Sequence, residues 1–408
     1  MDSGGSTTST ESTAGGRALP GWVRSPWAVF VGVRLAYLCF TAFTLVWAPL
    51  PPNRFAVSHA WGGLSNTFFG TFEHFDADYF LLIAREGYTA SDAAFMPTYP
   101  GLVHLLGPLL GSNLVAALLL SLAAGAVGVQ LVAVVARDVL GPAVARDTTL
   151  LLALYPVAFI FTSAYSEGLF LAAAAAATVC ATRGRPVAAG ALAGVAVSTR
   201  LIGIALVPML VVLLWSRARE RRWQLLVPVV ALPAAGLAAV SLYFDHALGD
   251  GLAFLHAQRE WGRHVSALGP IDGIWRSACA AAHGVWTIAT TSQADYGRVA
   301  ISLDSWNVVD FALLLGAAAL TVVVFRRLGR AYGIYSAAVL VIATSSPVTD
   351  GGEVLQSMVR LLLADFPLFI AGAALLQSSE SRRVATLWTL GAIGAVTGAA
   401  FARTTWIA

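Results

Sequence analysis

The sequence predicts an all-α polytopic membrane protein. Of its 408 residues, 58% are hydrophobic and only 12% are charged, and the mean hydropathy is +0.74. A soluble globular domain carries about twice that charged fraction. The net charge of +3 is small and gives no basis for nucleic-acid binding. The three cysteines lie far apart and indicate neither a disulfide framework nor a zinc site.

Apolar runs predict about eleven transmembrane helices, because a spanning helix needs about 20 mostly apolar residues. The run 186–216 is too long for one helix and has arginines at both ends, so we expect two short helices that meet near Thr199 and Arg200. The candidate spans are 27–50, 113–136, 147–164, 166–182, 186–199, 201–216, 224–244, 307–325, 331–346, 359–378 and 385–407.

Residues 23–408 are predicted to form a single integral membrane domain. Residues 1–22 are rich in serine, threonine and glycine and hold no apolar stretch, so we expect a disordered cytoplasmic tail. The lack of a short apolar region near the start argues against a cleaved signal peptide.

Arginines orient the predicted helices. Under the positive-inside rule, short loops rich in arginine are cytoplasmic. Because successive helices cross the plasma membrane in alternate directions, the amino terminus is then cytoplasmic. Three segments are extracytoplasmic: 51–112, 245–306 and 347–358. Four clusters agree on this topology: Arg183 and Arg185; Arg217, Arg219, Arg221 and Arg222; Arg326, Arg327 and Arg330; and Arg382 and Arg383.

The two long outer loops, 51–112 and 245–306, mix aromatic residues with acids and apolar turns. Such segments suit interfacial helices at the outer membrane surface, with tryptophan and tyrosine at headgroup depth. All seven histidines lie in these loops or at their edges. None has the spacing of a ligand set with a nearby carboxylate, so no metal site is expected.

Two acids stand close together in the stretch HFDADYFLLIAREGY. Residues at i and i+2 do not face the same way on a helix. We therefore expect Asp78 to cap the helix Tyr79–Glu86, a position that the helix dipole favours for an acid. Asp76, which is flanked by His74 and Phe75, is the better candidate for chemistry.

A second polar site interrupts the stretch YPVAFIFTSAYSEGLF. Tyr165, Ser166 and Glu167 form a break between two predicted helices on the outer side. A carboxylate at membrane depth is costly and by default indicates a function or a buried partner. The sequence leaves equally open a structural role, in which Ser166 caps the following helix.

Two arginines lie at outer helix ends, against the positive-inside trend: Arg200 and Arg360. Each could snorkel to lipid phosphates or clamp a substrate phosphate with its planar guanidinium. Arg34, nearer the cytoplasmic end of the first helix, is expected to snorkel or to meet a structural partner. The sequence holds no P-loop, nucleotide fingerprint or protease motif. The outer charges therefore predict an outward-facing cavity for a donor linked to a lipid phosphate.

These stretches resemble the PIG-V-type family of GPI mannosyltransferase II-like proteins and their bacterial relatives, within the GT-C superfamily of membrane glycosyltransferases. Three residues depart from the family pattern: Phe75 replaces a tryptophan, Met96 a phenylalanine and Val359 a proline. Asp78 falls where the family tolerates small residues, which favours Asp76 as the catalytic acid. The segments that carry the resemblance are HFDADYFLLIAREGY, AFMPTYPGLVHLL, YPVAFIFTSAYSEGLFL, STRLIG, GDGLAFLHAQREWGR and SMVRLLLADFPLF.

The resemblance implies a GT-C-like bundle and a polyprenyl-phosphate-mannose donor, whose sugar passes with inversion to a glycolipid or glycan acceptor. The sequence itself gives no metal-binding residues and no cofactor to expect. A phosphate leaves as a stable anion, so one base suffices where glycoside hydrolysis uses two carboxyls. In this interpretation Asp76 is the base, Arg200 and Arg360 bind the donor phosphate, and Tyr165 and Glu167 position the sugar or acceptor, with His74, Asp78 and Trp261 as further substrate-binding candidates.

Two alternatives stay open. The same chemistry could use another polyprenyl-phosphate sugar, such as arabinose or glucose, because sugar selectivity rests on cavity shape. The chain could instead be a lipid or glycan transporter or an inactive scaffold, because broken helices with polar kinks also occur in transporters. The sequence shows no clear inverted repeat, and its two large aromatic outer loops fit a transferase better.

Overall fold

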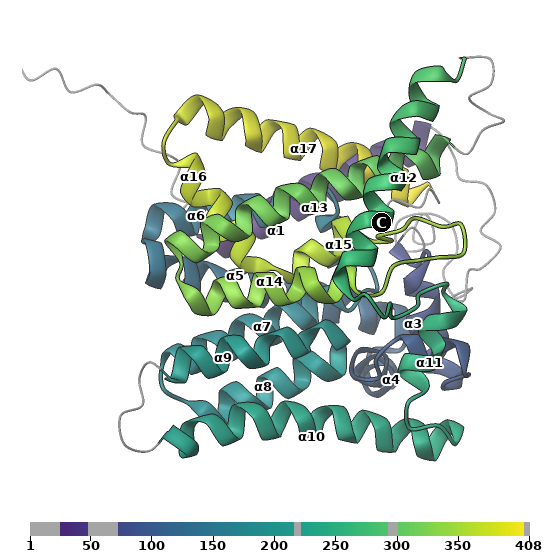
Figure 1. Ribbon diagram of the computed structural model, residues 1–408, viewed down its shortest axis with the longest axis vertical. Helices are drawn as coiled ribbons and strands as arrows, with labels where there is room; N and C mark the ends of the chain where they lie inside the picture. The colour runs from purple at the N-terminus through teal and green to yellow at the C-terminus, as the bar shows by residue number, and fades with distance from the viewer. Residues whose placement is uncertain (1–24, 48–71, 216–221, 293–300, 404–408) are drawn as a thin grey trace, which may run out of the picture.

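The computed structural model describes residues 25–47, 72–215, 222–292 and 301–403, and this part of the chain is an α-helical bundle (Figure 1). The predicted all-α fold class is therefore confirmed. Five long helices run along the bundle: α1 (Pro26–Trp47), α5 (Asn113–Leu140), α10 (Arg222–Leu248), α13 (Ile301–Arg327) and α17 (Glu380–Ala402). Six shorter ones lie among them: α6 (Pro142–Leu154), α7 (Glu167–Thr182), α8 (Pro186–Thr199), α9 (Leu206–Trp215), α14 (Arg330–Thr344) and α16 (Phe366–Leu376).

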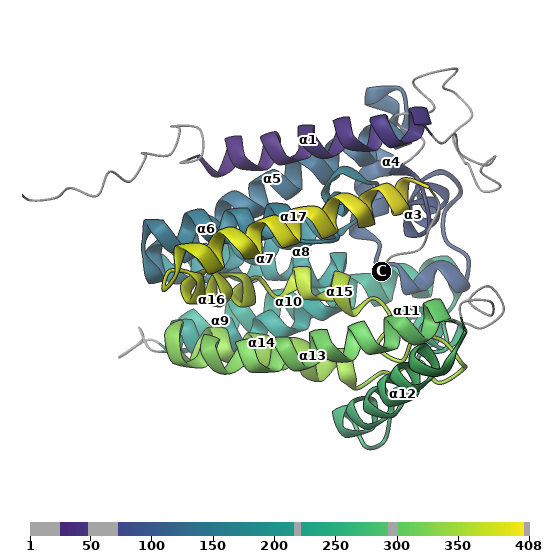
Figure 2. The ribbon, with the colours of Figure 1, turned by 90° about the horizontal axis from the view of Figure 1, so that it is seen from above.

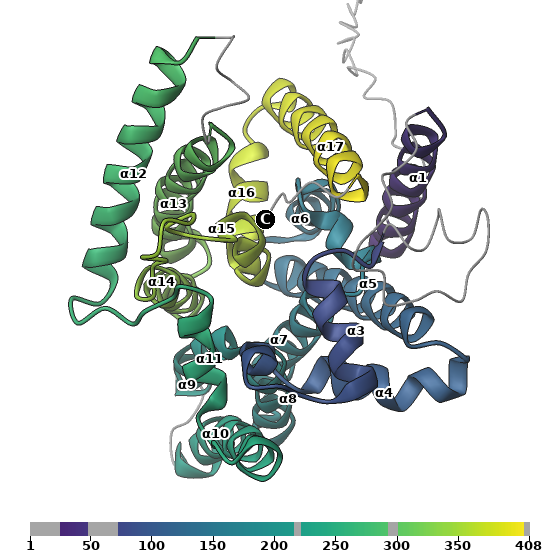
Figure 3. The ribbon, with the colours of Figure 1, turned by 90° about the vertical axis from the view of Figure 1, so that its right-hand side faces the viewer.

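Short helices gather at one end of the bundle, which we call the α3 end (Figure 2). They are α3 (Asp76–Glu86), α4 (Thr98–Leu110), α11 (Ala253–Glu260) and the 3-10 helix η3 (Ser91–Ala94). In Figure 3, which faces this end, α3, α4 and α11 lie over the ends of the bundle helices. The segments 51–112 and 245–306 thus contain helices, as predicted, although residues 48–71 and 293–300 lie outside the described part.

One helix at this end, α12 (Pro270–Thr290), runs across the direction of the bundle (Figure 1). It is amphipathic. Its small residues Gly273 and Ala281 are buried, whereas Trp275 and Trp286 are 69% and 68% exposed. This pattern agrees with the interfacial helix that the aromatic residues of this loop predicted. The loop is shorter than expected, because α10 continues to Leu248 and α13 already begins at Ile301.

Within the described residues, each predicted span corresponds to helical structure, but two of the spans are broken. The span 147–164 divides into α6 and the 3-10 helix η4 (Ala158–Thr162) around Pro156, which has no backbone N–H to continue a helix. The buried Arg34 guanidinium donates to the carbonyls of Ala153 and Ala158 on the two sides of this break. Arg34 therefore has a structural partner, and the snorkelling alternative is wrong.

The span 359–378 is the second broken one. It divides into α15 (Met358–Leu361) with the 3-10 helix η7 (Leu362–Ala364), then α16, at a bend of 86°. In the described residues, five helices are long and apolar enough to cross a membrane, or six if this bent pair forms one span. Four shorter apolar segments add candidates: 167–182, 186–199, 201–215 and 330–344. The count of eleven spans stays a prediction.

Helices α5 and α7 pack closely through glycine. A Cβ on Gly168 would lie 2.7 Å from the carbonyl oxygen of Ser121 and 2.9 Å from the backbone nitrogen of Gly125. Small residues allow such close approach between membrane helices. Because Gly168 directly follows Glu167, this contact fixes where the first turn of α7 lies.

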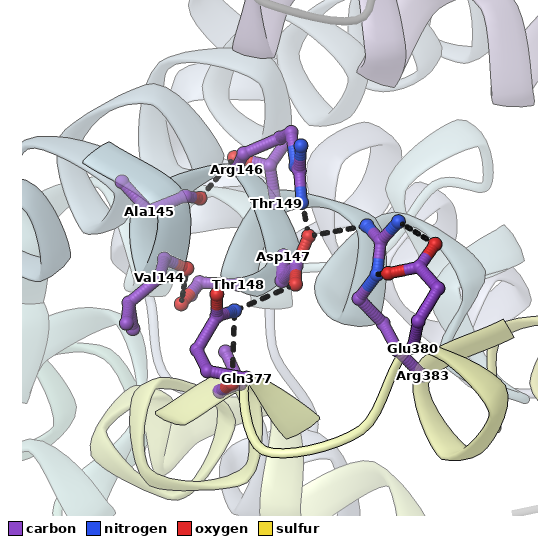
Figure 4. Close-up of polar contacts among 10 residues, drawn as sticks. Val144, Ala145, Arg146, Asp147, Thr148, Thr149, Gln377, Glu380 and Arg383 are labelled. Carbon is purple, nitrogen blue, oxygen red and sulfur yellow. Dashed lines mark hydrogen bonds and ion pairs between the residues drawn. The ribbon is translucent and has the colours of Figure 1, made fainter. Parts of the chain in front are cut away.

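A buried polar cluster joins helices at the end of the bundle opposite α3 (Figures 2 and 4). The fully buried Asp147 of α6 accepts hydrogen bonds from Arg146 (2.9 Å), Gln377 (2.7 Å) and Arg383 (3.1 Å). Arg383 also donates to Glu380 at 2.6 Å. Arg383 was expected in a loop, but it lies in the first turn of α17, where its contact with Asp147 connects α17 to α6.

Candidate active site

Asp76 is the first residue of α3, and its carboxylate is buried against Arg360. The Arg360 guanidinium donates to the Asp76 Oδ2, although the two residues lie 284 positions apart in the sequence. The Asp76 side chain is only 12% exposed and the Arg360 side chain only 10%. Buried charges are tolerated where they are paired. The pair therefore fixes the start of α3 against α15.

Glu167 connects Arg360 to a second arginine. The Glu167 Oε1 lies 3.3 Å from the Nε of Arg360 and 2.6 Å from the Nη1 of Arg200. Arg200 stands where α8 ends and the 3-10 helix η5 (Leu201–Ala205) begins, and it also donates to the hydroxyl of Ser166 at 3.2 Å. Asp76, Arg360, Glu167 and Arg200 thus form one chain of ion pairs, which we call the charge cluster.

Tyr165 contacts both the segment before α3 and Arg360 of the charge cluster. Its hydroxyl donates to the backbone carbonyl of His74 at 3.2 Å, and its buried ring lies 5.5 Å from the guanidinium carbon of Arg360. A guanidinium over an aromatic face gains cation–π attraction. Tyr165 therefore links the residues before α3 to Arg360 and holds the guanidinium in place.

Two strained residues lie beside the Asp76–Arg360 pair. Phe75 (φ 62°) and Ser357 (φ 67°) are the non-glycine residues with positive φ among those described. Phe75 directly precedes Asp76, and the Ser357 hydroxyl lies 3.5 Å from the Nη2 of Arg360. Such backbone costs on the order of 1–3 kcal/mol and persists only where the surroundings enforce it. The fold therefore maintains this pair at the expense of local backbone strain.

Among the predicted site residues, His74 lies at the edge of the cluster in an aromatic environment. Its ring centroid is 6.2 Å from that of Phe75 and 6.1 Å from that of Phe401. Burial lowers the pKa of His74 to about 4, so the ring is neutral at pH 7. His74 thus contributes packing and its backbone carbonyl, and it brings no charge to the cluster.

Among the described residues, Asp78 forms no ion pair with the charge cluster, whose pairs join Asp76 and Glu167 to the two arginines. The residue before α3, Phe75, does not cap the helix with its own side chain. Asp78 instead accepts a hydrogen bond from the backbone N–H of Phe75, which agrees with the predicted capping role of Asp78. Its Oδ1 is buried and has no hydrogen-bond partner among the described residues. Burial and then repulsion by Glu73 raise the pKa of Asp78 to about 8, whereas the Phe75 N–H lowers it. Asp78 therefore holds a proton at pH 7.

Trp261 also lies apart from the ion pairs. Its ring contacts Tyr79 (centroids 5.3 Å apart) and Phe95 (5.7 Å), and these two rings stack on each other at 5.1 Å. The cluster of three rings packs the end of α11 against α3 and the segment that follows η3. The structure thus brings Asp76, Tyr165, Glu167, Arg200, Arg360 and His74 together and places Asp78 and Trp261 at their periphery.

One further arginine of this region, Arg263, was not predicted from the sequence. Its Nη2 donates to the carbonyl of Gln356 at 2.9 Å, and its backbone pairs with Val348. Arg360, Asp76 and Arg200 all act on its charge. The stretch REWGR could have pointed to it, because Arg263 follows Arg259 within a loop that was predicted to lie outside.

The arrangement can support proton transfer and anion binding. A carboxylate held by an arginine is an oriented proton acceptor, and clustered guanidiniums bind phosphate with directed N–H groups. Within the described ranges, no group of three or more His, Cys, Asp or Glu side chains could hold a metal ion.

Comparison with known families finds a match over part of the chain. Residues 48–224 match the family model described as mannosyltransferase (PIG-V). The PIG-V resemblance is confirmed over this range. The matched range contains Asp76, Tyr165, Glu167 and Arg200 and ends before Arg263 and Arg360. No match is found among curated proteins.

Solved structures of similar fold are also found. ArnT from Cupriavidus metallidurans, bound to undecaprenyl phosphate, is similar over 91% of this chain at 18% identity, with a TM-score of 0.51. The chain spans 63% of the length of ArnT. The Archaeoglobus fulgidus oligosaccharyltransferase in its apo form is similar at 14% identity over 91% of this chain and 56% of its own, with a TM-score of 0.42. The likeness to ArnT confirms the predicted helical fold.

Glu167→Gln is expected to lower thermal stability. The change leaves Arg200 without its carboxylate partner and Arg360 with one partner in place of two. Breaking a buried pair on one side costs on the order of 3 kcal/mol. The melting temperature of the purified protein in detergent measures this. Glu86→Gln is the matched control, because the Glu86–Arg85 pair is exposed and such pairs contribute little. Equal melting temperatures for both variants would contradict the role given to Glu167.

Asp78 is expected to make stability depend on pH. Its folded-state pKa of about 8 lies above its ordinary value of 3.8, so the folded protein binds more protons between these values. Stability therefore falls as pH rises from about 4 to about 8 and then levels off. Asp78→Asn removes this contribution. Melting temperatures of the two proteins should diverge in favour of the variant between pH 5.5 and pH 8.5, and parallel curves would contradict the assignment.

Proposed function

We propose that the protein transfers mannose from a polyprenyl-phosphate-mannose donor to a lipid-linked or glycan acceptor, with inversion, at the extracytoplasmic face of the plasma membrane. The observation that carries the proposal is the charge cluster, in which one acid is held by an arginine beside further guanidiniums. The match to the PIG-V mannosyltransferase family supports the sugar, and it covers the part of the chain that supplies Asp76 and Glu167.

In the proposed reaction the acceptor hydroxyl oxygen attacks the anomeric carbon of the mannose. Asp76 takes the hydroxyl proton as the new C–O bond forms. The bond from the anomeric carbon to the phosphate oxygen breaks, and its electron pair leaves with the polyprenyl phosphate. A single displacement from the face opposite the phosphate inverts the configuration at that carbon. The phosphate departs as a stable anion, so no second carboxyl has to protonate it.

Arg360 orients the base in this mechanism. Its guanidinium contacts the carboxylates of Asp76 and Glu167 at once, and Tyr165 and Ser357 hold it in place. A guanidinium carries five N–H groups in a fixed plane, so Arg360 can bridge two acids and still face a third anion. Preorganised donors of this kind stabilise charge that develops in the transition state.

The carrier lipid fits the fold. ArnT, which has a similar fold, is bound to undecaprenyl phosphate, a lipid of the proposed class. The arginine-rich loops favour a cytoplasmic amino terminus, and in this proposed orientation the α3 end and its charge cluster face outward. Nucleotide sugars are not expected on that face, so a lipid-linked donor is the consistent choice.

Asp76→Asn is expected to reduce mannose transfer by about 10²- to 10⁴-fold, the range for loss of a general base. Transfer from polyprenyl-phosphate-mannose is measured with purified protein in liposomes, and thermal unfolding verifies that the variant is folded. Asp138→Asn is the matched control, because Asp138 is an exposed acid paired with Arg137 away from the cluster. A folded Asp76→Asn protein with the native rate would remove Asp76 as base.

The same liposome assay separates the competing functions. Glucose or arabinose donors that are used faster than the mannose donor would reassign the sugar. Movement of labelled lipid across the bilayer without any transfer would favour a transporter.

A further inference from the structure

The arginines first expected to hold the donor phosphate are already paired with acids. Asp76 is bound by Arg360, and Glu167 is bound by both Arg360 and Arg200. Two carboxylates thus balance two guanidiniums. A phosphate that approaches these four residues alone meets a charge cluster with no net positive charge.

Arg263 supplies a cation that these acids do not neutralise. It forms no ion pair with an acid in the described part of the chain; its recorded side-chain hydrogen bond goes to the neutral carbonyl of Gln356 at 2.9 Å. Burial and repulsion by Arg360 lower the pKa of Arg263 to about 10, with Asp76 opposing and Arg200 adding to the shift. The guanidinium is therefore still charged at pH 7, half-buried and within electrostatic range of three members of the charge cluster.

The backbone around Arg263 is fixed on both sides. Gly262 adopts φ 69°, a left-handed conformation that favours glycine, and its carbonyl accepts a hydrogen bond from Thr349 at 3.0 Å. Arg263 itself forms an antiparallel bridge with Val348. Gln356, its side-chain partner, lies next to the strained Ser357. Arg263 and Arg360 are thus held by the same short segment.

We propose that Arg263 is the residue that binds the phosphate of the polyprenyl-linked donor, while Arg360 orients Asp76; this rests on the proposed function. Three guanidiniums against two carboxylates leave these five residues with a net charge of one positive. A polyprenyl-phosphate sugar is a phosphodiester with a single negative charge, which this surplus neutralises. Bond cleavage converts it into a phosphate monoester with more negative charge, so the interaction with Arg263 strengthens as the leaving group departs.

Lipid binding to the purified full-length protein in nanodiscs tests the proposal, with undecaprenyl phosphate and the uncharged undecaprenol as probes. Arg263→Gln is expected to weaken undecaprenyl phosphate binding by about tenfold or more, the loss typical of a charge-assisted hydrogen bond. Undecaprenol binding should change by less than about twofold. Arg263→Lys, which keeps the charge, should restore most of the phosphate affinity. Arg259→Gln, an exposed arginine of α11, is the matched control.

Two results would overturn the proposal. Either Arg263→Gln binds undecaprenyl phosphate as tightly as the Arg259→Gln control, or it loses undecaprenol binding to the same degree, which would show a merely structural role. Mannose transfer by the wild-type protein distinguishes the two proposals. If transfer persists and depends on Asp76 while Arg263→Gln binds the phosphate normally, only the role of Arg263 fails. If the wild type neither transfers sugar nor binds undecaprenyl phosphate, both fail.

Discussion

The architecture of the α3 end depends on one buried ion pair, between Asp76 and Arg360. A single buried charge would destabilise this part of the protein, so each of the two residues requires the other. The two residues lie 284 positions apart in the sequence, so the contact between them holds the start of α3 against α15. Glu167 of α7 pairs with Arg360 and with Arg200 at the end of α8, so the same network of ion pairs also holds these two helices. The strained backbone at Phe75 and Ser357 is the local cost of that geometry.

The helices and most members of the candidate site were predictable from the sequence, for a simple reason. Apolar runs determine where helices form in a membrane, and charges in an otherwise apolar chain are few enough to stand out. Asp76, Glu167, Arg200 and Arg360 were each singled out as charges near predicted outer helix ends. Apolar runs alone did not reveal the interruptions within the spans 147–164 and 359–378. There the fold depends on distant partners, such as the Arg34 guanidinium for the carbonyls on either side of Pro156.

Which distant charges pair with each other could not be predicted from the sequence. Nothing in the local sequence shows that Arg360 contacts Asp76, or that Asp147 of α6 meets Arg383 of α17 at the opposite end of the bundle (Figure 4). Arg263 was missed because only arginines at helix ends were considered, whereas it lies in a loop. There its backbone pairs with Val348 and its side chain donates to the carbonyl of Gln356. In the proposed mechanism this changes the division of roles: Arg360 orients the base, and Arg263 binds the phosphate.

The central claim is that the charge cluster at the α3 end is where the lipid phosphate binds and the sugar is transferred. An experimental structure of the full-length protein in nanodiscs with undecaprenyl phosphate tests this most directly. The account predicts phosphate density within hydrogen-bond distance of the Arg263 guanidinium and next to the Asp76–Arg360 pair. Phosphate density at the opposite end of the bundle, beside Asp147 and Arg383, with the charge cluster unchanged and empty, would contradict it.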